Sequence, residues 1–127
     1  MPQGCGQTPR QNLKNFENAE KYLLLSIDNY QSLNDAHPRA YEKELVQSLA
    51  GMALLYARNN MIEKANNYYY RACNILPNNN NVMDAKGVIE YMKGQVDKAT
   101  ETWEKKKSLD PTAEENSWLY ELLFVKK

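Results

Sequence analysis

The sequence repeats itself at an interval of about 34 residues, and this repeat restricts the possible folds more than any other feature. Superposing the chain on itself at this interval aligns a small residue, an aromatic residue and a proline in the same order. The aligned pairs are Ile62 with Val96, Ala65 with Ala99, Tyr69 with Trp103, Pro77 with Pro111, and Asn60 with Gly94. A repeat of this length is a unit that cannot bury its apolar face alone, so neighbouring units must stack into an array.

Each repeat contains the residue types that two packed helices require. Ala65 and Ala99 are each followed four positions later by an aromatic residue, Tyr69 and Trp103, so each pair lies on one helix face. A small side chain lets two antiparallel helix axes approach closely, and the aromatic ring fills the space beside it. The closing prolines cannot extend a helix, so the chain turns there into the next unit.

This pattern resembles the tetratricopeptide repeat family, and the resemblance covers a little over half of the chain. Full repeats are expected at 46–79 and 80–113, with Ala53 and Gly87 at the small position of their first helices and Ala72 at a further small position. The resemblance implies an all-α fold, a right-handed solenoid of about six antiparallel helices arranged as hairpins.

The predicted helices are 11–33, 38–59, 62–76, 80–93, 96–109 and 112–125. Residues 1–10 are expected to form a flexible tail, and 11–127 a single domain. Pro38 suits the first position of the second helix. Thr112 and Glu115 form a capping box for the last helix, which we expect to cap the exposed end of the array.

Charged residues depart from the repeat pattern near the end of the array. Lys106 stands where the first repeat has Ala72, and Glu121 takes the position equivalent to Ala53 and Gly87. Two interpretations remain open. Either Lys106 and Glu121 approach within ion-pair distance, or this end is loosely packed and both charges reach water.

The charge balance and the hydropathy argue against several kinds of partner. The chain has 16 basic and 16 acidic residues, so no net field attracts nucleic acid or an anionic membrane, and neither is an expected partner. No segment approaches the roughly 20 apolar residues of a transmembrane helix. The one basic run, Lys105–Lys107, falls near a predicted helix C-terminus, where the helix dipole favours cations.

The sequence offers little of what catalysis or cofactor binding needs. His37 is the only histidine, so a multi-histidine metal site and the usual histidine-dependent catalysis have little support. No phosphate-cradling glycine-rich motif occurs. Cys73 falls within a helical pattern and is interpreted as a small core residue. We therefore expect no enzyme activity, no cofactor and no metal site.

The family resemblance implies that the first helices line a concave groove that binds a peptide or a helix of a partner protein. The predicted lining is Gln47, Ala50, Leu54, Ala57, Arg58, Asp84, Val88, Tyr91, Trp118 and Leu122. An apolar groove of this kind suits an amphipathic helix, and Trp118 is its expected hot spot. Some family members bind the Hsp70/Hsp90 C-terminal tail through a Lys, Asn and Arg clamp. Ala50, Leu54 and Asp84 replace that clamp, so this partner is not expected. Alternatively, the long N-terminal helix fills the groove itself.

The sequence thus predicts a protein–protein interaction module, an adaptor or a scaffold, without identifying the partner. One alternative is a structural subunit of a larger complex, or a protein that pairs with itself as a homo-oligomer. Another is a bacterial envelope protein that assists secretion or pilus assembly, lipid-anchored at Cys5, which follows Gly4. That alternative requires an export segment before Met1. If Met1 is the natural start, a cytoplasmic location is expected.

Overall fold

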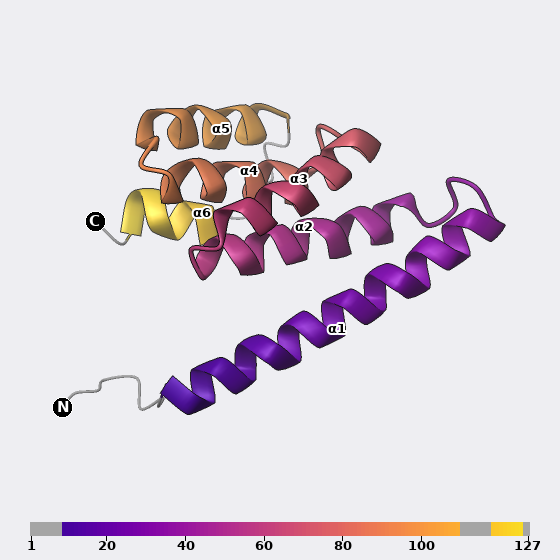
Figure 1. The fold of residues 1–127 in the computed structure, drawn as a ribbon. Coiled ribbons are helices and arrows are strands. Elements are labelled where there is room, and N and C mark those ends of the chain that lie inside the picture. The colour runs from indigo at the N-terminus through magenta and orange to yellow at the C-terminus, as the bar shows by residue number, and fades with distance from the viewer. Residues whose placement is uncertain (1–8, 110–117, 126–127) are drawn as a thin grey trace.

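The computed structural model describes residues 9–109 and 118–125, and every regular element within these ranges is helical (Figure 1). The helices are α1 (Pro9–Ala36), α2 (Glu42–Arg58), α3 (Ile62–Ile75), α4 (Asn80–Met92), α5 (Val96–Leu109) and the short α6 (Trp118–Tyr120), which continues as a π-helical turn (Glu121–Val125). The predicted all-α fold is therefore confirmed. The predicted capping box at Thr112 and Glu115 lies outside the described residues.

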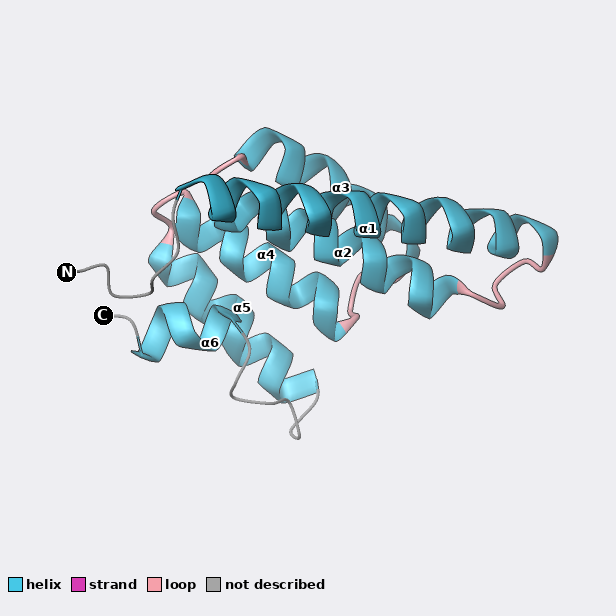
Figure 2. Ribbon diagram, turned by 90° about the horizontal axis from the view of Figure 1, so that it is seen from below, coloured by secondary structure: helices cyan, strands magenta, loops and turns pink. Residues whose placement is uncertain are grey.

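The helices form two hairpins with an additional helix at each end. Short connections fold α3 back onto α2 and α5 back onto α4, and α2 also packs on α4, which joins the two hairpins. Helix α1 packs along α2 at one end of this arrangement, while α6 packs on α4 and α5 at the other (Figures 1 and 2). The predicted helices 62–76, 80–93 and 96–109 agree with α3, α4 and α5 to within one residue.

The turns inside the two hairpins are built in the same way. Asn60 and Gly94 both adopt positive φ angles, of 62° and 84° respectively. At each turn the next residue donates a hydrogen bond five positions back, Met61 to the Tyr56 carbonyl at 2.8 Å and Gln95 to the Glu90 carbonyl at 2.9 Å. This is the Schellman arrangement that ends a helix through one left-handed residue. The aligned turn residues therefore occupy equivalent places in space.

The connection between α1 and α2 differs from the sequence prediction. Helix α1 continues to Ala36, and α2 begins at Glu42 rather than at Pro38. Arg39 has a φ of 70°, which no right-handed helix accommodates, so the residues after Pro38 form a turn. The Asn34 side chain accepts a hydrogen bond from the Tyr41 backbone at 3.2 Å and ties this turn to the end of α1.

Small residues lie at the closest helix contacts, as the repeat pattern predicts. Ala65, Ala72 and Ala99 are all 0% exposed. Gly87 on α4 faces Leu119 on α6 so closely that an added Cβ would lie 2.3 Å from Leu119 Cδ2. The absence of a side chain at Gly87 is therefore what lets the C-terminal helix sit on α4.

The aligned aromatic residues are not equally buried. Trp103 is 4% exposed and contacts the rings of Tyr120 and Phe124, at centroid distances of 5.4 and 6.2 Å. Tyr69, predicted to be the buried aromatic of the first repeat, is only partly buried. Trp103 is the more buried of the two because Tyr120 and Phe124, near the C-terminus, cover its ring.

Tyr56 links the first hairpin to α1. Its ring is buried, and its hydroxyl donates a hydrogen bond of 2.5 Å to the Glu20 carboxylate on α1. Phe16, also on α1, contacts the same ring at a centroid distance of 6.0 Å. Burial and the bond to Glu20 raise the pKa of the Tyr56 hydroxyl above its ordinary value.

Replacing Gly87 with alanine should destabilise the contact between α4 and α6. We expect Gly87→Ala to lower the free energy of unfolding by roughly 1–3 kcal/mol, because Leu119 must move. In Gly51→Ala, the new Cβ would lie 3.1 Å from a single terminal methyl of Leu23, and alanine favours the helix, so we expect no loss. Chemical denaturation of both variants measures the difference. Adding Leu119→Ala to Gly87→Ala should yield less than the sum of the two losses, and strict additivity would contradict this account.

Tyr56→Phe should cost roughly 1–3 kcal/mol at neutral pH, because it removes a hydrogen bond to a charged group. The wild type should also lose stability as the pH rises above about 10. There the unfolded tyrosine ionises while the folded one, with its raised pKa, retains its proton. Denaturation at pH 7 and at alkaline pH should show a shallower alkaline decline for Tyr56→Phe. The control is Tyr70→Phe, because Tyr70 is 59% exposed and should change neither quantity.

Candidate functional site

Four residues predicted to line an apolar groove lie inside the protein instead. Val88 and Ala57 are 0% exposed, Ala50 2% and Leu122 7%. Ala50 belongs to a small cluster with other alanines of α2 and α4, and Leu122 belongs to the main core together with Leu119. The prediction of an apolar groove is corrected at these positions, because neighbouring helices and the C-terminal helix cover them.

The other predicted groove residues differ in exposure. Gln47 and Arg58 are exposed, whereas Leu54 and Tyr91 are half-buried and pack against the core. Trp118 begins α6, but its side chain lies outside the described part of the structure. Leu54 and Tyr91 are thus the predicted apolar lining that keeps some accessible surface.

Asp84 does not face a groove but pairs with a buried lysine. Lys106 Nζ lies 3.1 Å from Asp84 Oδ1, and the two side chains are 6% and 16% exposed. The Lys106 ammonium also lies 5.3 Å from the centroid of the Trp103 ring. The predicted pairing of Lys106 with Glu121 is therefore wrong. Lys106 projects from α5 toward α4, where Asp84 supplies the opposite charge, and the alternative in which it reaches water is excluded by its burial.

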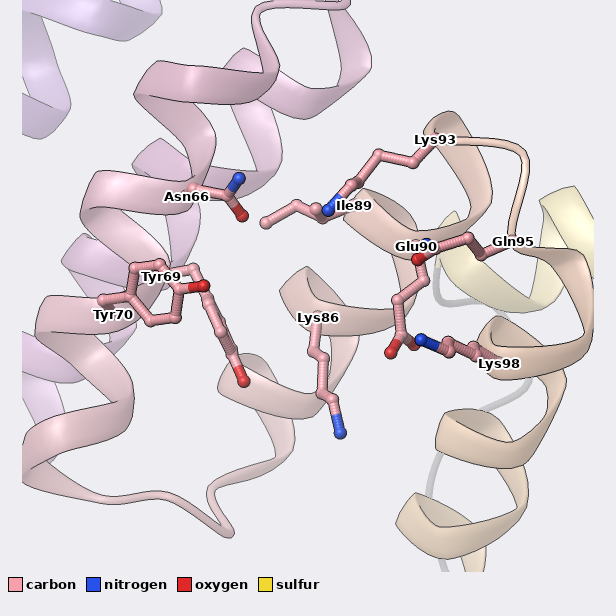
Figure 3. A pocket seen from close by; sticks show the side chains of 9 residues that line it. All are labelled: Asn66, Tyr69, Tyr70, Lys86, Ile89, Glu90, Lys93, Gln95 and Lys98. Carbon is pink, nitrogen blue, oxygen red and sulfur yellow. The ribbon is translucent and has the colours of Figure 1, made fainter.

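The structure has a cleft in a place that the sequence did not indicate. Its volume is about 270 Å³, and it lies where α3, α4 and α5 meet (Figure 3). The lining residues are Asn66, Tyr69, Tyr70, Lys86, Ile89, Glu90, Lys93, Gln95 and Lys98. Both hairpins contribute to it, so the cleft exists only because the hairpins are stacked.

Positive charge dominates this cleft, which holds three lysines and one glutamate. Figure 3 shows Lys93 extending from the end of α4 across the cleft, and Lys98 extending from α5 toward Glu90. Within the described ranges, Lys86, Lys93 and Lys98 have no carboxylate at ion-pair distance.

A hydrogen bond holds the one acidic side chain of the cleft in place. Glu90 accepts a bond of 2.6 Å from the buried Thr102 hydroxyl, which fixes its carboxylate on the α5 side. Burial raises the pKa of the Tyr69 hydroxyl above its ordinary value, and the neighbouring Cys73 and Glu90 raise it further. The protonated Tyr69 hydroxyl can donate a hydrogen bond at neutral pH.

The size and chemistry of the cleft suit the docking of side chains. Its volume of about 270 Å³ is below the roughly 300–1,000 Å³ of small-molecule pockets.

Over the described residues, no group of three or more His, Cys, Asp or Glu side chains is placed to hold a metal ion. No described helix is both long enough and apolar enough to cross a membrane.

Sequence reasoning missed this cleft because its lysines resemble an ordinary solvated face. Lys86 lies on α4 and Lys93 directly follows its last residue, and the seven-residue spacing keeps both on one side of the helix. Lys98 belongs to the next helix, and only the fold brings it near them. One sequence feature did mark this region: Glu90 stands where the first repeat has the aromatic residue Tyr56.

In comparisons with known proteins, no family model, curated protein or solved structure matches this chain significantly.

Removing one member of the buried Asp84–Lys106 pair should be costly. Asp84→Ala leaves a buried ammonium without its carboxylate, and we expect a loss of roughly 3 kcal/mol in unfolding free energy. Asp84→Ala/Lys106→Met should be more stable than Asp84→Ala alone, because no unpaired charge remains. Glu42→Ala is the matched control at the exposed Arg39–Glu42 pair and should cost at most about 1 kcal/mol. Equal losses for Asp84→Ala and Glu42→Ala in urea denaturation would show that the Asp84 pair is not effectively buried.

Proposed function

We propose that this chain is a non-catalytic protein-binding module of the tetratricopeptide repeat type, a right-handed stack in which α2–α3 and α4–α5 are the two full repeats. Its binding site is the cleft between α3, α4 and α5, and its partner is an acidic segment of another protein. The observation that carries this proposal is the group of three lysines from the α4–α5 hairpin that line one cleft and lack carboxylate partners among the described residues.

The geometry of the hairpins supports the repeat part of the proposal. The turns at Asn60 and Gly94 share their hydrogen bonds and their left-handed residue, and the alanines at positions 65 and 99 are equally buried. Repeat arrays are built from units that share their turns and their close helix contacts in this way. Such arrays use the surfaces between units to bind other proteins.

The contents of the cleft support the acidic partner. An Asp or Glu side chain entering the cleft would meet ammonium groups from Lys86, Lys93 and Lys98, while Asn66 and Gln95 offer amide donors. Glu90 repels an anion on the α5 side, which favours an approach along Lys93 and Lys86. The exposed tyrosine, Tyr70, provides an apolar surface at the rim for the neighbouring residues of the segment.

The test uses a fluorescein-labelled decapeptide in which Glu alternates with Leu, and a second decapeptide with Gln in place of Glu. We expect fluorescence anisotropy to show binding of the Glu peptide that weakens between 20 and 200 mM NaCl, because these charges are screened. Lys86→Gln/Lys98→Gln should weaken binding about 2- to 30-fold, which corresponds to roughly 0.2–1 kcal/mol for each accessible charge pair.

The matched control is Lys14→Gln/Lys43→Gln, which removes the same charge from exposed positions on α1 and α2. This variant should bind the Glu peptide as the wild type does. Equal losses in the two double variants would mean that the peptide responds only to net charge. Equal binding of the Gln peptide would also contradict the proposal, because the cleft would then not select acidic residues.

A further inference from the structure

Helix α1 has an uncharged outer strip that no described part of the chain covers. The strip consists of Tyr22, Leu25, Ser26, Asn29, Ser32 and Leu33, which recur at helical spacing along one side of α1. Tyr22 is 69% exposed, Leu25 58% and Leu33 40%. All six residues, with Tyr30, line a surface hollow of about 620 Å³ formed by α1 alone.

The position of α1 leaves this strip accessible from outside. Leu23 and Ile27 on the other side of α1 pack into the core, so the contact with α2 is already made. Figure 1 shows α1 at one edge of the molecule, and Figure 2, seen from that side, shows it in front of the other helices. A partner laid along the strip would therefore meet α1 without displacing another described helix.

Four residues of the strip follow the same pattern in both chain directions from Asn29, whereas Tyr22, seven positions before Asn29, corresponds to Ala36 and has no counterpart. Counted from Asn29, serines lie three positions before and after it, at Ser26 and Ser32, and leucines lie four positions before and after it, at Leu25 and Leu33. A two-fold axis through two antiparallel helices brings each residue opposite its counterpart at the same distance on the other side of the centre. Each of these serines and leucines therefore comes opposite a residue of its own type, so this patch can pack on a second copy of itself.

We infer that a second copy of this chain occupies the strip, with the two α1 helices packed antiparallel about a two-fold axis at Asn29. Leu25 of each copy then faces Leu33 of the partner subunit, and Ser26 faces Ser32 of the partner subunit. The apolar contacts supply the burial, and the central asparagines and serines fix the register through hydrogen bonds, as buried polar residues do in paired helices.

The charges beside the strip support this arrangement. Lys21 and Asp35 lie on one flank of α1, and both are exposed. In an antiparallel pair related by this axis, equal flanks meet, so Lys21 of each copy comes alongside Asp35 of the partner subunit. Asp28 lies on the same flank near the axis, where its two copies approach. Two attractive pairs thus outnumber one repulsive contact.

The inference is independent of the acidic-segment cleft, which lies on α3, α4 and α5. Sedimentation velocity of the full chain from about 1 to 500 µM should show a concentration-dependent monomer–dimer equilibrium. Leu25→Glu should raise the dimer dissociation constant about tenfold or more, since the change occurs twice in the interface. Peptide binding in the cleft should stay unchanged in this variant, so failure of one proposal is distinguishable from failure of the other.

The matched control is Leu24→Glu, because Leu24 is 39% exposed but lies away from the strip on the helix circumference. This variant should dimerise like the wild type. A monomeric wild type at the highest concentration would overturn the inference, and so would a dimer unaffected by Leu25→Glu, which would use another surface.

A charge exchange tests the antiparallel register. Lys21→Asp and Asp35→Lys should each weaken the dimer, because each places like charges side by side in both symmetry-related pairs. The double variant Lys21→Asp/Asp35→Lys restores opposite charges and should recover the affinity of the wild type. No recovery in the double variant, with folding verified by circular dichroism, would exclude this register.

Discussion

The close approach of neighbouring helices at alanine and glycine positions is the contact on which the rest of the structure depends. Ala53, Ala85 and Ala99 are 0% exposed, and Gly87 has no room for a Cβ beside Leu119. Side chains of this size let helix backbones approach, and the larger residues beside them fill the remaining space. A larger residue at one of these points separates two helices along their length.

This packing determines which surfaces remain for other molecules. The seating of Leu119 on Gly87 brings the C-terminal helix against α4 and α5, where Leu122 becomes part of the core. The buried pair of Asp84 and Lys106 adds a charged contact between α4 and α5. The apolar lining that a repeat pattern predicts for a groove is thereby largely used inside the protein. The polar cleft between the two hairpins stays accessible.

The cleft and the outer strip of α1 lie on different helices and differ in chemistry. The cleft has excess positive charge and partly buried tyrosine, whereas the strip is uncharged and combines leucine with serine and asparagine. Pairing through α1 would leave α3, α4 and α5 free in both copies. The proposed dimer would therefore present two acidic-segment sites, and a partner with two such segments would bind with higher avidity than one.

The sequence by itself determined the helices, the turns and the small residues at helix contacts, because each depends on neighbours within a few positions or on one repeat period. Asn60 and Gly94 lie in matching left-handed turns, and Ala65 and Ala99 are buried alike. The start of α2 was mispredicted because the backbone of Arg39, and not the proline before it, controls that turn. The spacing of the strip residues around Asn29 can also be read from the sequence. Their exposure to solvent cannot, because it depends on which side of α1 packs on α2.

Only the tertiary structure decided which side chains meet across helices. Lys106 pairs with Asp84 and not with Glu121, and Tyr69 is partly exposed whereas its counterpart Trp103 is buried. Likewise, Lys98 joins Lys86 in one cleft because α5 folds back on α4. The spacing of residues fixes the helix face on which a side chain lies. The distance between two faces, and therefore every ion pair, cleft and covered ring, depends on how closely the helices pack, which is a property of all the contacts together.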